Sequence, residues 1–202
     1  MSDPAEKPTR RWRSTEATRQ AVLNAAIEVF DRDGYSEARI GEIVERSSAS
    51  VGSIYHHFGG KAEIFEVLWE RYNDAMWQAV RDAVSSAREA GETDPMENAL
   101  VGARAYLSSL TDPEHAKLAR IMATGDAPPE LSERMQKEQR KWVQGNVHAL
   151  GFGRGVDAQL RASVVVAMLG EAEMTYARDP REGLLEELTA SIDDMLRRLL
   201  TR

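Results

Sequence analysis

The chain has 202 residues, of which 42% are hydrophobic and 29% are charged, and its formal net charge at pH 7 is −7. These proportions are typical of a globular protein with a packed core and exclude a disordered chain. There is no cysteine, which excludes disulfides, thiolate zinc sites and cysteine nucleophiles. The longest nearly apolar run, residues 162–169, is far shorter than the roughly 20 residues of a membrane span. The N-terminus is polar and basic, without the apolar segment of a secretory signal. We therefore expect a cytoplasmic protein with no membrane partner.

The negative charge is unevenly distributed along the chain. Residues 1–61 hold nine Lys/Arg and nine Asp/Glu, so the whole net charge of −7 lies in residues 62–202. Four basic residues precede Glu16, the first acidic residue of the first predicted helix: Lys7, Arg10, Arg11 and Arg13. We expect residues 1–14 to form a flexible basic arm. Such arms are usually solvated tails, but they can also contact nucleic-acid phosphates.

Helical periodicity dominates the sequence and strand-type alternation is absent, which predicts an all-α fold. The first predicted helix covers about residues 15–33, and Gly34 ends it. A short helix follows at about residues 37–46. Another short helix at about residues 50–57 has Ser50 as its N-cap, because a serine hydroxyl accepts hydrogen bonds from free backbone N–H groups. The inner side of this last helix is predicted to carry Val51, Ile54 and Phe58.

Six longer helices are predicted after this small unit. Asp94-Pro95 and Asp112-Pro113 each place a capping carboxylate before a proline, the order expected at a helix start. The glycine-rich residues 151–155 have neither the preceding strand nor the closing Lys-Ser/Thr of a phosphate loop, which predicts an inter-helix turn. The predicted helices cover about residues 61–90, 95–110, 113–123, 130–150, 157–178 and 181–200.

The four histidines do not form a metal site. Adjacent helical residues point about 100° apart, so His56 and His57 cannot easily face one ion. His115 and His148 have no carboxylate or histidine at the spacing of a helical metal motif. No nucleophile elbow or other nucleophile–base signature is present either. We therefore predict no metal, no cofactor and no enzymatic activity.

Two short helices joined by a turn of small residues, after a longer bracing helix, are typical of a helix-turn-helix DNA-binding unit. The outer side of the 50–57 helix carries Ser50, Gly52 and Ser53, and small side chains let a helix enter a major groove about 12 Å wide. Donors suited to phosphate oxygens follow at its far end. These donors are Tyr55, His56, His57 and Lys61.

Over about residues 15–68 the sequence resembles the N-terminal domain of TetR-type transcriptional regulators. The matching positions are Phe30, Gly34-Tyr35, Ile40, Ile43 and the pattern Ser50-x-Gly52-Ser53-Ile54-Tyr55-x-His57-Phe58-x-x-Lys61. The resemblance implies that residues 15–60 are a DNA-binding domain and residues 50–57 its recognition helix. It further implies phosphate contacts by Tyr55, His56, His57 and Lys61, and a contact by Arg39 from the preceding helix.

The sequence departs from the family pattern at three places. Ser48-Ala49 replaces a frequent Gly-Val, and Ala38-Arg39 replaces threonines at the start of the second helix. Val51 stands where the family often has a basic residue. A valine there loses the polar contact of the basic side chain but can contact the methyl group of a thymine. The predicted DNA-contacting residues are Arg39, Ser50, Val51, Gly52, Ser53, Tyr55, His56, His57 and Lys61, with Arg10, Arg11 and Arg13 of the arm.

Residues 61–202 carry no family signature of their own. By the resemblance, they form an all-α domain that dimerises through its last two helices and binds a small ligand. The last helix has a broad apolar stripe, compatible either with a dimer interface or with plain core: Leu184, Leu185, Leu188, Ile192, Met195, Leu196, Leu199 and Leu200. In a homodimer, two recognition helices roughly 34–36 Å apart would read a palindrome.

A ligand site is predicted from methionine and aromatic side chains on the helices of this domain. Such residues line adaptable apolar pockets, although they also fill cores. The predicted apolar residues are Trp69, Tyr72, Met76, Tyr106, Met122, Met135, Trp142 and Met168. The predicted polar residues are Arg104, Arg120 and Glu171.

Together these observations predict a dimeric transcriptional regulator, a repressor that a largely apolar small molecule releases from a palindromic double-stranded operator. Two alternatives remain open. One is an adaptor whose N-terminal unit binds protein, and the other is a helical enzyme without a visible catalytic signature. Phosphate binding weakens steeply with salt, whereas an apolar protein interface does not, so salt dependence separates DNA binding from protein binding.

Overall fold

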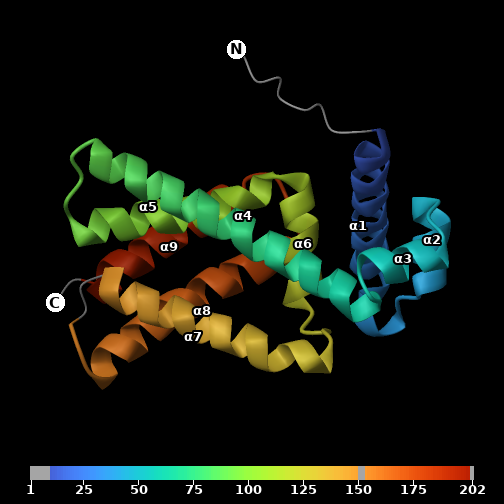
Figure 1. The fold of residues 1–202 in the computed structure, drawn as a ribbon. Coiled ribbons are helices and arrows are strands. Elements are labelled where there is room, and N and C mark those ends of the chain that lie inside the picture. The colour runs from blue at the N-terminus through green and yellow to red at the C-terminus, as the bar shows by residue number, and fades with distance from the viewer. Residues whose placement is uncertain (1–9, 150–152, 201–202) are drawn as a thin grey trace, which may run out of the picture. The chain divides into compact units, whose positions relative to one another are not determined.

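The computed structural model describes residues 10–149 and 153–200, and within these ranges the chain forms nine α-helices and no strands (Figure 1). The predicted all-α fold is confirmed. The chain divides into two compact units, one up to Leu68 and one from Trp69 onward. The boundary falls inside α4 (Lys61–Glu89), so this helix contributes residues to both units.

The first unit contains α1 (Arg10–Glu37), α2 (Ile40–Ser47), α3 (Val51–His57) and the start of α4. Helix α2 packs against α1 and α3. Helix α1 begins at Arg10, earlier than the sequence indicates, so residues 10–14 are helical and the predicted flexible arm 1–14 is too long. Arg10, Arg11 and Arg13 belong to this first part of α1, and their side chains lie outside the described ones.

Gly34 breaks the regular geometry of α1. Its φ of 78° and ψ of 170° are non-helical, and the chain adds a last short segment to Glu37 after it. Side chains other than hydrogen rarely tolerate this backbone conformation, which is why a glycine stands here. The predicted end of the first helix at Gly34 therefore corresponds to a kink within α1.

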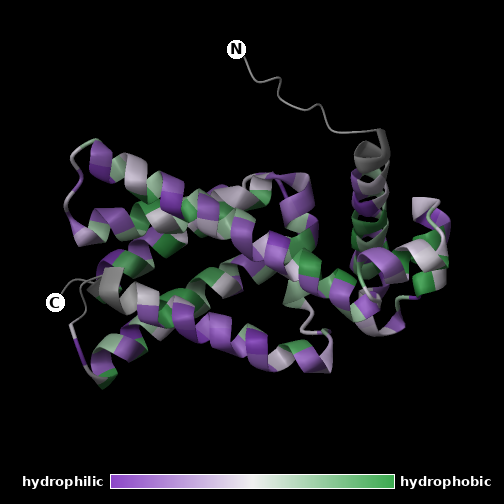
Figure 2. Ribbon diagram, viewed as in Figure 1, coloured by the Kyte–Doolittle hydropathy of each residue, from purple (hydrophilic) through white to green (hydrophobic). Residues whose placement is uncertain are grey.

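Aromatic and β-branched side chains form the core of the first unit. The ring centroids of Phe30, Tyr35 and Phe65 lie 5.2–6.0 Å apart in pairwise contact. Ile43 of α2 and Ile54 of α3 are fully buried. Each such side chain stabilises the fold by about 1.5–3 kcal/mol relative to an exposed position. Figure 2 shows hydrophobic and hydrophilic residues interspersed along the helices.

The second unit is a bundle in which α8 packs against four other helices, α5, α6, α7 and α9. Its elements after α4 are α5 (Pro95–Ser108), the 3₁₀ turn η1 (Ser109–Thr111), α6 (Pro113–Ala123), the 3₁₀ turn η2 (Pro129–Leu131), α7 (Ser132–Ala149), α8 (Val156–Arg178) and α9 (Leu184–Leu200).

Two of these helices begin where the Asp-Pro pairs predict. The Asp94 carboxylate accepts a hydrogen bond from the backbone N–H of Met96 at 2.8 Å, and the Asp112 carboxylate accepts one from that of His115 at 2.8 Å. A proline occupies the first helical position in both cases, where its missing N–H removes no helical hydrogen bond. Both predicted caps are confirmed.

None of the helices in the described ranges is long and apolar enough to cross a membrane.

Candidate nucleic-acid interface and ligand cavity

The turn between α2 and α3 is held by serine side chains. Ser48 ends α2 with a φ of 55°, a left-handed conformation that is uncommon for a residue other than glycine. The Ser47 hydroxyl accepts a hydrogen bond from the backbone N–H of Ala49 at 3.3 Å. The Ser50 hydroxyl accepts one from the backbone N–H of Ser53 at 3.0 Å, which confirms Ser50 as the N-cap of α3.

Helix α3 has one buried and one open side. Ile54 is fully buried, whereas the side chains of Val51 and Tyr55 are 51% and 54% exposed. Gly52 and His56 are exposed as well. The placement of Val51 on the inner side was wrong, because the short helix buries only the face that carries Ile54. The exposed side is the one predicted to meet DNA.

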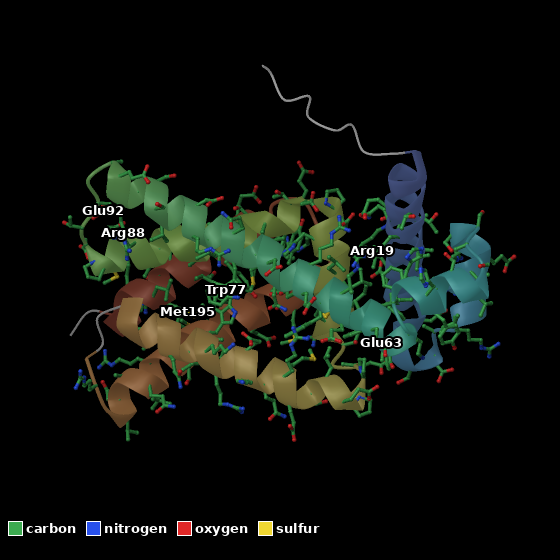
Figure 3. The ribbon with its side chains drawn as sticks, viewed as in Figure 1. Arg19, Glu63, Trp77, Arg88, Glu92 and Met195 are labelled. Atoms are coloured by element: carbon green, nitrogen blue, oxygen red, sulfur yellow. The ribbon has the colours of Figure 1, made fainter. Side chains whose placement is uncertain are left out.

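Phe58, predicted as a core residue, is only half-buried and follows α3 as its C-cap. The guanidinium carbon of Arg19, labelled in Figure 3, lies 5.2 Å from the centroid of its ring. A cation over an aromatic face is attracted by the ring quadrupole. Because Arg19 belongs to α1, this contact holds the end of α3 against α1.

Lys61 has a structural role that the sequence did not indicate. Its ammonium donates hydrogen bonds to the carbonyls of Tyr35, Ser36 and Ala38 at 2.6, 3.3 and 3.0 Å. It also lies 4.3 Å from the centroid of the Tyr35 ring. Because an ammonium has three N–H donors, this arrangement uses all of them. The Lys61 side chain thus binds carbonyl groups at the end of α1, and its phosphate contact stays a prediction.

The arginines on and around α2 differ in their partners. Arg32 pairs with Asp33 and with Glu42 at 2.6 Å, and its hydrogen bonds hold the pKa of both carboxyls below the usual value. Arg46 also pairs with Glu42, at 3.2 Å. Arg39, the N-terminal flanking residue of α2, is exposed and forms no ion pair with any described residue. Its charge is therefore available to a partner outside the chain.

His56 and His57 lie at the end of α3 with their ring centroids 5.1 Å apart and their planes 62° apart. Within the described residues, no group of three or more His, Asp or Glu side chains is placed to hold a metal ion.

The second unit contains an open cavity of about 570 Å³ between α4, α5, α6, α7 and α8. Most of the residues predicted for the ligand site line it. These are Trp69, Tyr72, Met76, Tyr106, Met122, Met135, Trp142 and Glu171.

Three predicted ligand residues, Arg104, Arg120 and Met168, are absent from the lining. Arg104 of α5 instead forms a bidentate ion pair with Asp193 of α9, with its Nε 2.9 Å from one carboxylate oxygen. Met168 lies between two lining residues of α8, Ala167 and Leu169, but its own side chain takes another direction around the helix. The packing of the helices thus places these side chains outside the cavity lining.

The central polar group of the cavity, Glu173, was not among the residues predicted from the sequence. Its side chain is only 6% exposed, and its two carboxyl oxygens accept hydrogen bonds from the hydroxyls of Tyr72 and Tyr106. Burial raises the pKa of the Glu173 carboxyl, and it raises the pKa of both tyrosines as well. Nothing in the local sequence distinguishes Glu173 from the solvated glutamates around it.

Stacked rings surround this polar centre. Trp77, labelled in Figure 3, stacks on Trp142 with the ring centroids 3.5 Å apart, and Trp142 meets Tyr106 edge to face at 6.3 Å. Tyr72 stacks on the buried His115 at 5.0 Å. Burial lowers the pKa of His115, which keeps the imidazole neutral. Four helices thereby fix the aromatic walls of the cavity.

A helix-turn-helix whose second helix has an exposed side, followed by a helical bundle with an open cavity, defines an all-α protein of the helix-turn-helix class. Residues 22–68 match the family model of bacterial regulatory proteins, tetR family. This match identifies the segment 22–68 as similar to the N-terminal domain of TetR-type transcriptional regulators.

Curated relatives match part of the chain. The HTH-type transcriptional regulator AcrR of Shigella flexneri is 36% identical over 55 residues, which is 27% of this chain and 26% of that protein. The HTH-type transcriptional regulator LmrA of Bacillus subtilis is 33% identical over 94 residues, 46% of either chain. The matched segments thus span between about a quarter and a half of these relatives.

Solved structures match nearly the whole chain in fold. NalD, the secondary repressor of the MexAB-OprM multidrug efflux pump in Pseudomonas aeruginosa, has a TM-score of 0.74 at 20% identity, covering 94% of this chain and 98% of that one. FadR from Bacillus subtilis, in complex with stearoyl-CoA, has a TM-score of 0.68 at 18% identity, covering 88% and 97%. These structures therefore share the fold of this chain, including the fold of its second unit.

Proposed function

We propose that the chain is a sequence-specific DNA-binding transcriptional regulator, a repressor, acting in the cytoplasm. The observation that carries the proposal is the exposed side of α3, where Val51 and Tyr55 are about half exposed although they flank the fully buried Ile54. Exposed apolar and aromatic side chains on a short helix favour contact with another molecule. The family match of this segment supports DNA as the partner.

Roles on this surface follow from chemistry and position. Val51, Gly52 and Ser53 at the start of α3 would meet base edges, with the valine methyls against a thymine methyl. The hydroxyl of Tyr55 and the imidazoles of His56 and His57 would bind phosphate oxygens. Basic groups complete the site as further phosphate contacts. They are Arg39 at the start of α2 and Arg10, Arg11 and Arg13 at the start of α1.

The regulator would act as a homodimer. Val156, Leu160 and Val164 are 84%, 61% and 37% exposed and follow one another at four-residue spacing, so they share one face of α8. Met195 of α9, labelled in Figure 3, is 40% exposed. A row of open apolar side chains favours association with a second copy. Two copies would present two recognition helices to a palindromic operator.

The cavity of the second unit would bind the small-molecule effector. Its volume of about 570 Å³ and its aromatic and methionine walls suit a small organic ligand. Helix α4 carries Trp69, Tyr72 and Met76 of the cavity and also belongs to the first unit. A ligand that prefers one position of α4 would shift the equilibrium toward it, by its differential affinity for the two states.

The alternatives from the sequence are less well supported. An adaptor that binds protein through α3 is not favoured by the family match, since these relatives are transcriptional regulators. The same match argues against an enzyme.

Substitutions on α3 and α2 test the proposal. Arg39→Ala should weaken binding to all DNA sequences and lower the salt slope by about 1, whereas Val51→Ala should change the preferred base. Fluorescence polarisation with an operator and a scrambled duplex, over a range of salt, measures both effects. Equal binding of the two duplexes by the unmodified protein would contradict sequence-specific recognition.

A further inference from the structure

Glu173 is a buried carboxyl group without a cationic partner. Its hydrogen bonds are to the hydroxyls of Tyr72 and Tyr106, and no Lys or Arg of the described chain forms an ion pair with it. Each carboxylate oxygen has two lone pairs, so one on each oxygen remains after the tyrosines are bound. A buried, ionised carboxylate whose charge is uncompensated is unfavourable, and an external cation would compensate it.

The rest of the cavity lining has the same sign of charge. Three glutamates line the cavity, Glu138, Glu171 and Glu173, and among the described residues the lining contains no Lys, Arg or His. Glu138 is paired with Lys141 at 2.6 Å, and Glu171 is exposed. Glu173 therefore provides a buried carboxyl group whose ionised form a bound cation would stabilise, and Glu171 adds negative charge at the edge of the cavity. Such a site disfavours anionic ligands.

Aromatic faces provide the second element of cation recognition. Trp69, Tyr72, Tyr106 and Trp142 line the cavity together with Glu173. The quadrupole of an aromatic ring attracts ammonium and similar groups, most strongly for tryptophan, and more so where water is excluded. Methionines of the lining, Met76, Met122, Met135 and Met174, supply adaptable apolar surface for the remainder of a ligand.

We propose that the cavity binds organic cations with an apolar body, placing the positive group between Glu173 and the rings of Tyr72, Tyr106 and Trp142. The inference rests on the proposed function in taking this cavity as the effector site. It narrows the ligand class to amphiphilic amines and quaternary ammonium compounds, and it excludes fatty acids and their thioesters with coenzyme A as the preferred class.

A series of ligands that differ only in their head group tests the charge preference. We would titrate the full-length, DNA-free protein with decyltrimethylammonium, decanol and decanoate by calorimetry, below micelle-forming concentrations. The cation should bind at least about tenfold more tightly than the alcohol, and the carboxylate more weakly than both. Equal affinities for the cation and the alcohol, or a preference for decanoate, would overturn the inference.

The substitution Glu173→Gln keeps the shape of the side chain and removes its charge. It should abolish the advantage of the cation over decanol while leaving decanol binding nearly unchanged. Glu133→Gln is the matched control, because Glu133 is an exposed glutamate of α7 outside the cavity lining. If both variants lose the preference equally, or neither does, Glu173 is not the recognition group and the inference fails. Circular dichroism of each variant confirms that it is folded.

A DNA-release assay separates this inference from the proposed function. Cation binding that depends on Glu173 but leaves a protein–operator complex intact would support the ligand class and contradict the proposed regulation. Release of the operator by decanol or decanoate, with no binding of the cation, would support the regulation and overturn the ligand class.

Discussion

Lys61 connects two chain segments that lie about 25 residues apart. The ammonium meets the carbonyls of Tyr35, Ser36 and Ala38, which follow the break at Gly34 and cannot be satisfied within the regular part of α1. Helix ends leave such carbonyls without intrahelical donors. The lysine thus fixes the connection between α1 and α2 on the start of α4.

We expect Lys61→Ala to lower the free energy of unfolding by about 1–3 kcal/mol, since hydrogen bonds from a charged group are lost. The salt slope of DNA binding should not change, because the ammonium is occupied. Urea denaturation and salt-dependent polarisation measure the two quantities. Lys137→Ala, at an exposed lysine of α7, is the control. If Lys61→Ala left the stability unchanged and reduced the salt slope, the Lys61 ammonium would instead contact a DNA phosphate.

Glu173 makes the stability of the second unit depend on pH. Burial raises its pKa in the folded protein above the ordinary value of 4.5. Between pH 4.5 and the raised pKa, the folded state therefore holds a proton that the unfolded state has released. This contribution to stability is complete below pH 4.5 and is lost as the pH rises through the raised pKa. The loss is about 1.4 kcal/mol for each pH unit that separates the folded and unfolded pKa values.

The variant Glu173→Gln has no carboxyl group to titrate and should lack this loss. The free energy of unfolding of the variant should therefore rise relative to that of the unmodified protein as the pH is raised from about 5 to 8. His115 has the opposite dependence, because its lowered pKa removes stability as the pH falls through 6.5 and below. It is present in both proteins and cancels in their difference. Thermal unfolding at several pH values gives that difference. A constant gap between the two proteins would contradict a raised Glu173 pKa.

At the scale of the element, the turn between α2 and α3 contains a strained position. Ser48 has a φ of 55°, which glycine adopts more easily than any side-chain-bearing residue. Ser48→Gly should stabilise the protein by about 0.5–1 kcal/mol, and Ser50→Ala should destabilise it by about 1 kcal/mol through loss of the α3 cap. Chemical denaturation measures the free energy of unfolding of both variants. A destabilised Ser48→Gly protein would show that its hydroxyl matters more than its backbone conformation.

Local sequence was sufficient to predict most of these elements. Caps such as Asp94, Asp112 and Ser50 act within three residues, and helical periodicity is a local property, so both can be read from the chain. The direction of Val51 and the burial of Glu173 depend on how separate helices pack. The partners of Lys61 lie at the end of α1 and in the connection that follows it, more than 20 residues away, so the local sequence could not reveal them either. The two aromatic hydroxyls that bind Glu173 are 67 and 101 residues away from it.

At the scale of the whole molecule, the open face of α8 should decide the oligomeric state. Leu160→Glu places a charge in the middle of the apolar row and should convert a dimer to a monomer without loss of helicity, because the side chain is 61% exposed. Gln159→Glu, at the exposed neighbouring position, is the control and should leave the dimer intact. Analytical ultracentrifugation measures the state. A monomeric unmodified protein, or a dimeric Leu160→Glu protein, would contradict this interface.

Selection of genomic fragments by the purified protein tests sequence-specific DNA recognition through α3. The selected fragments are then measured by fluorescence polarisation against salt. We expect an enriched near-palindrome that the protein binds at nanomolar level, with an affinity that falls steeply as salt is raised. Absence of enrichment by ligand-free protein, refolded from denaturant to remove any bound effector, would contradict it.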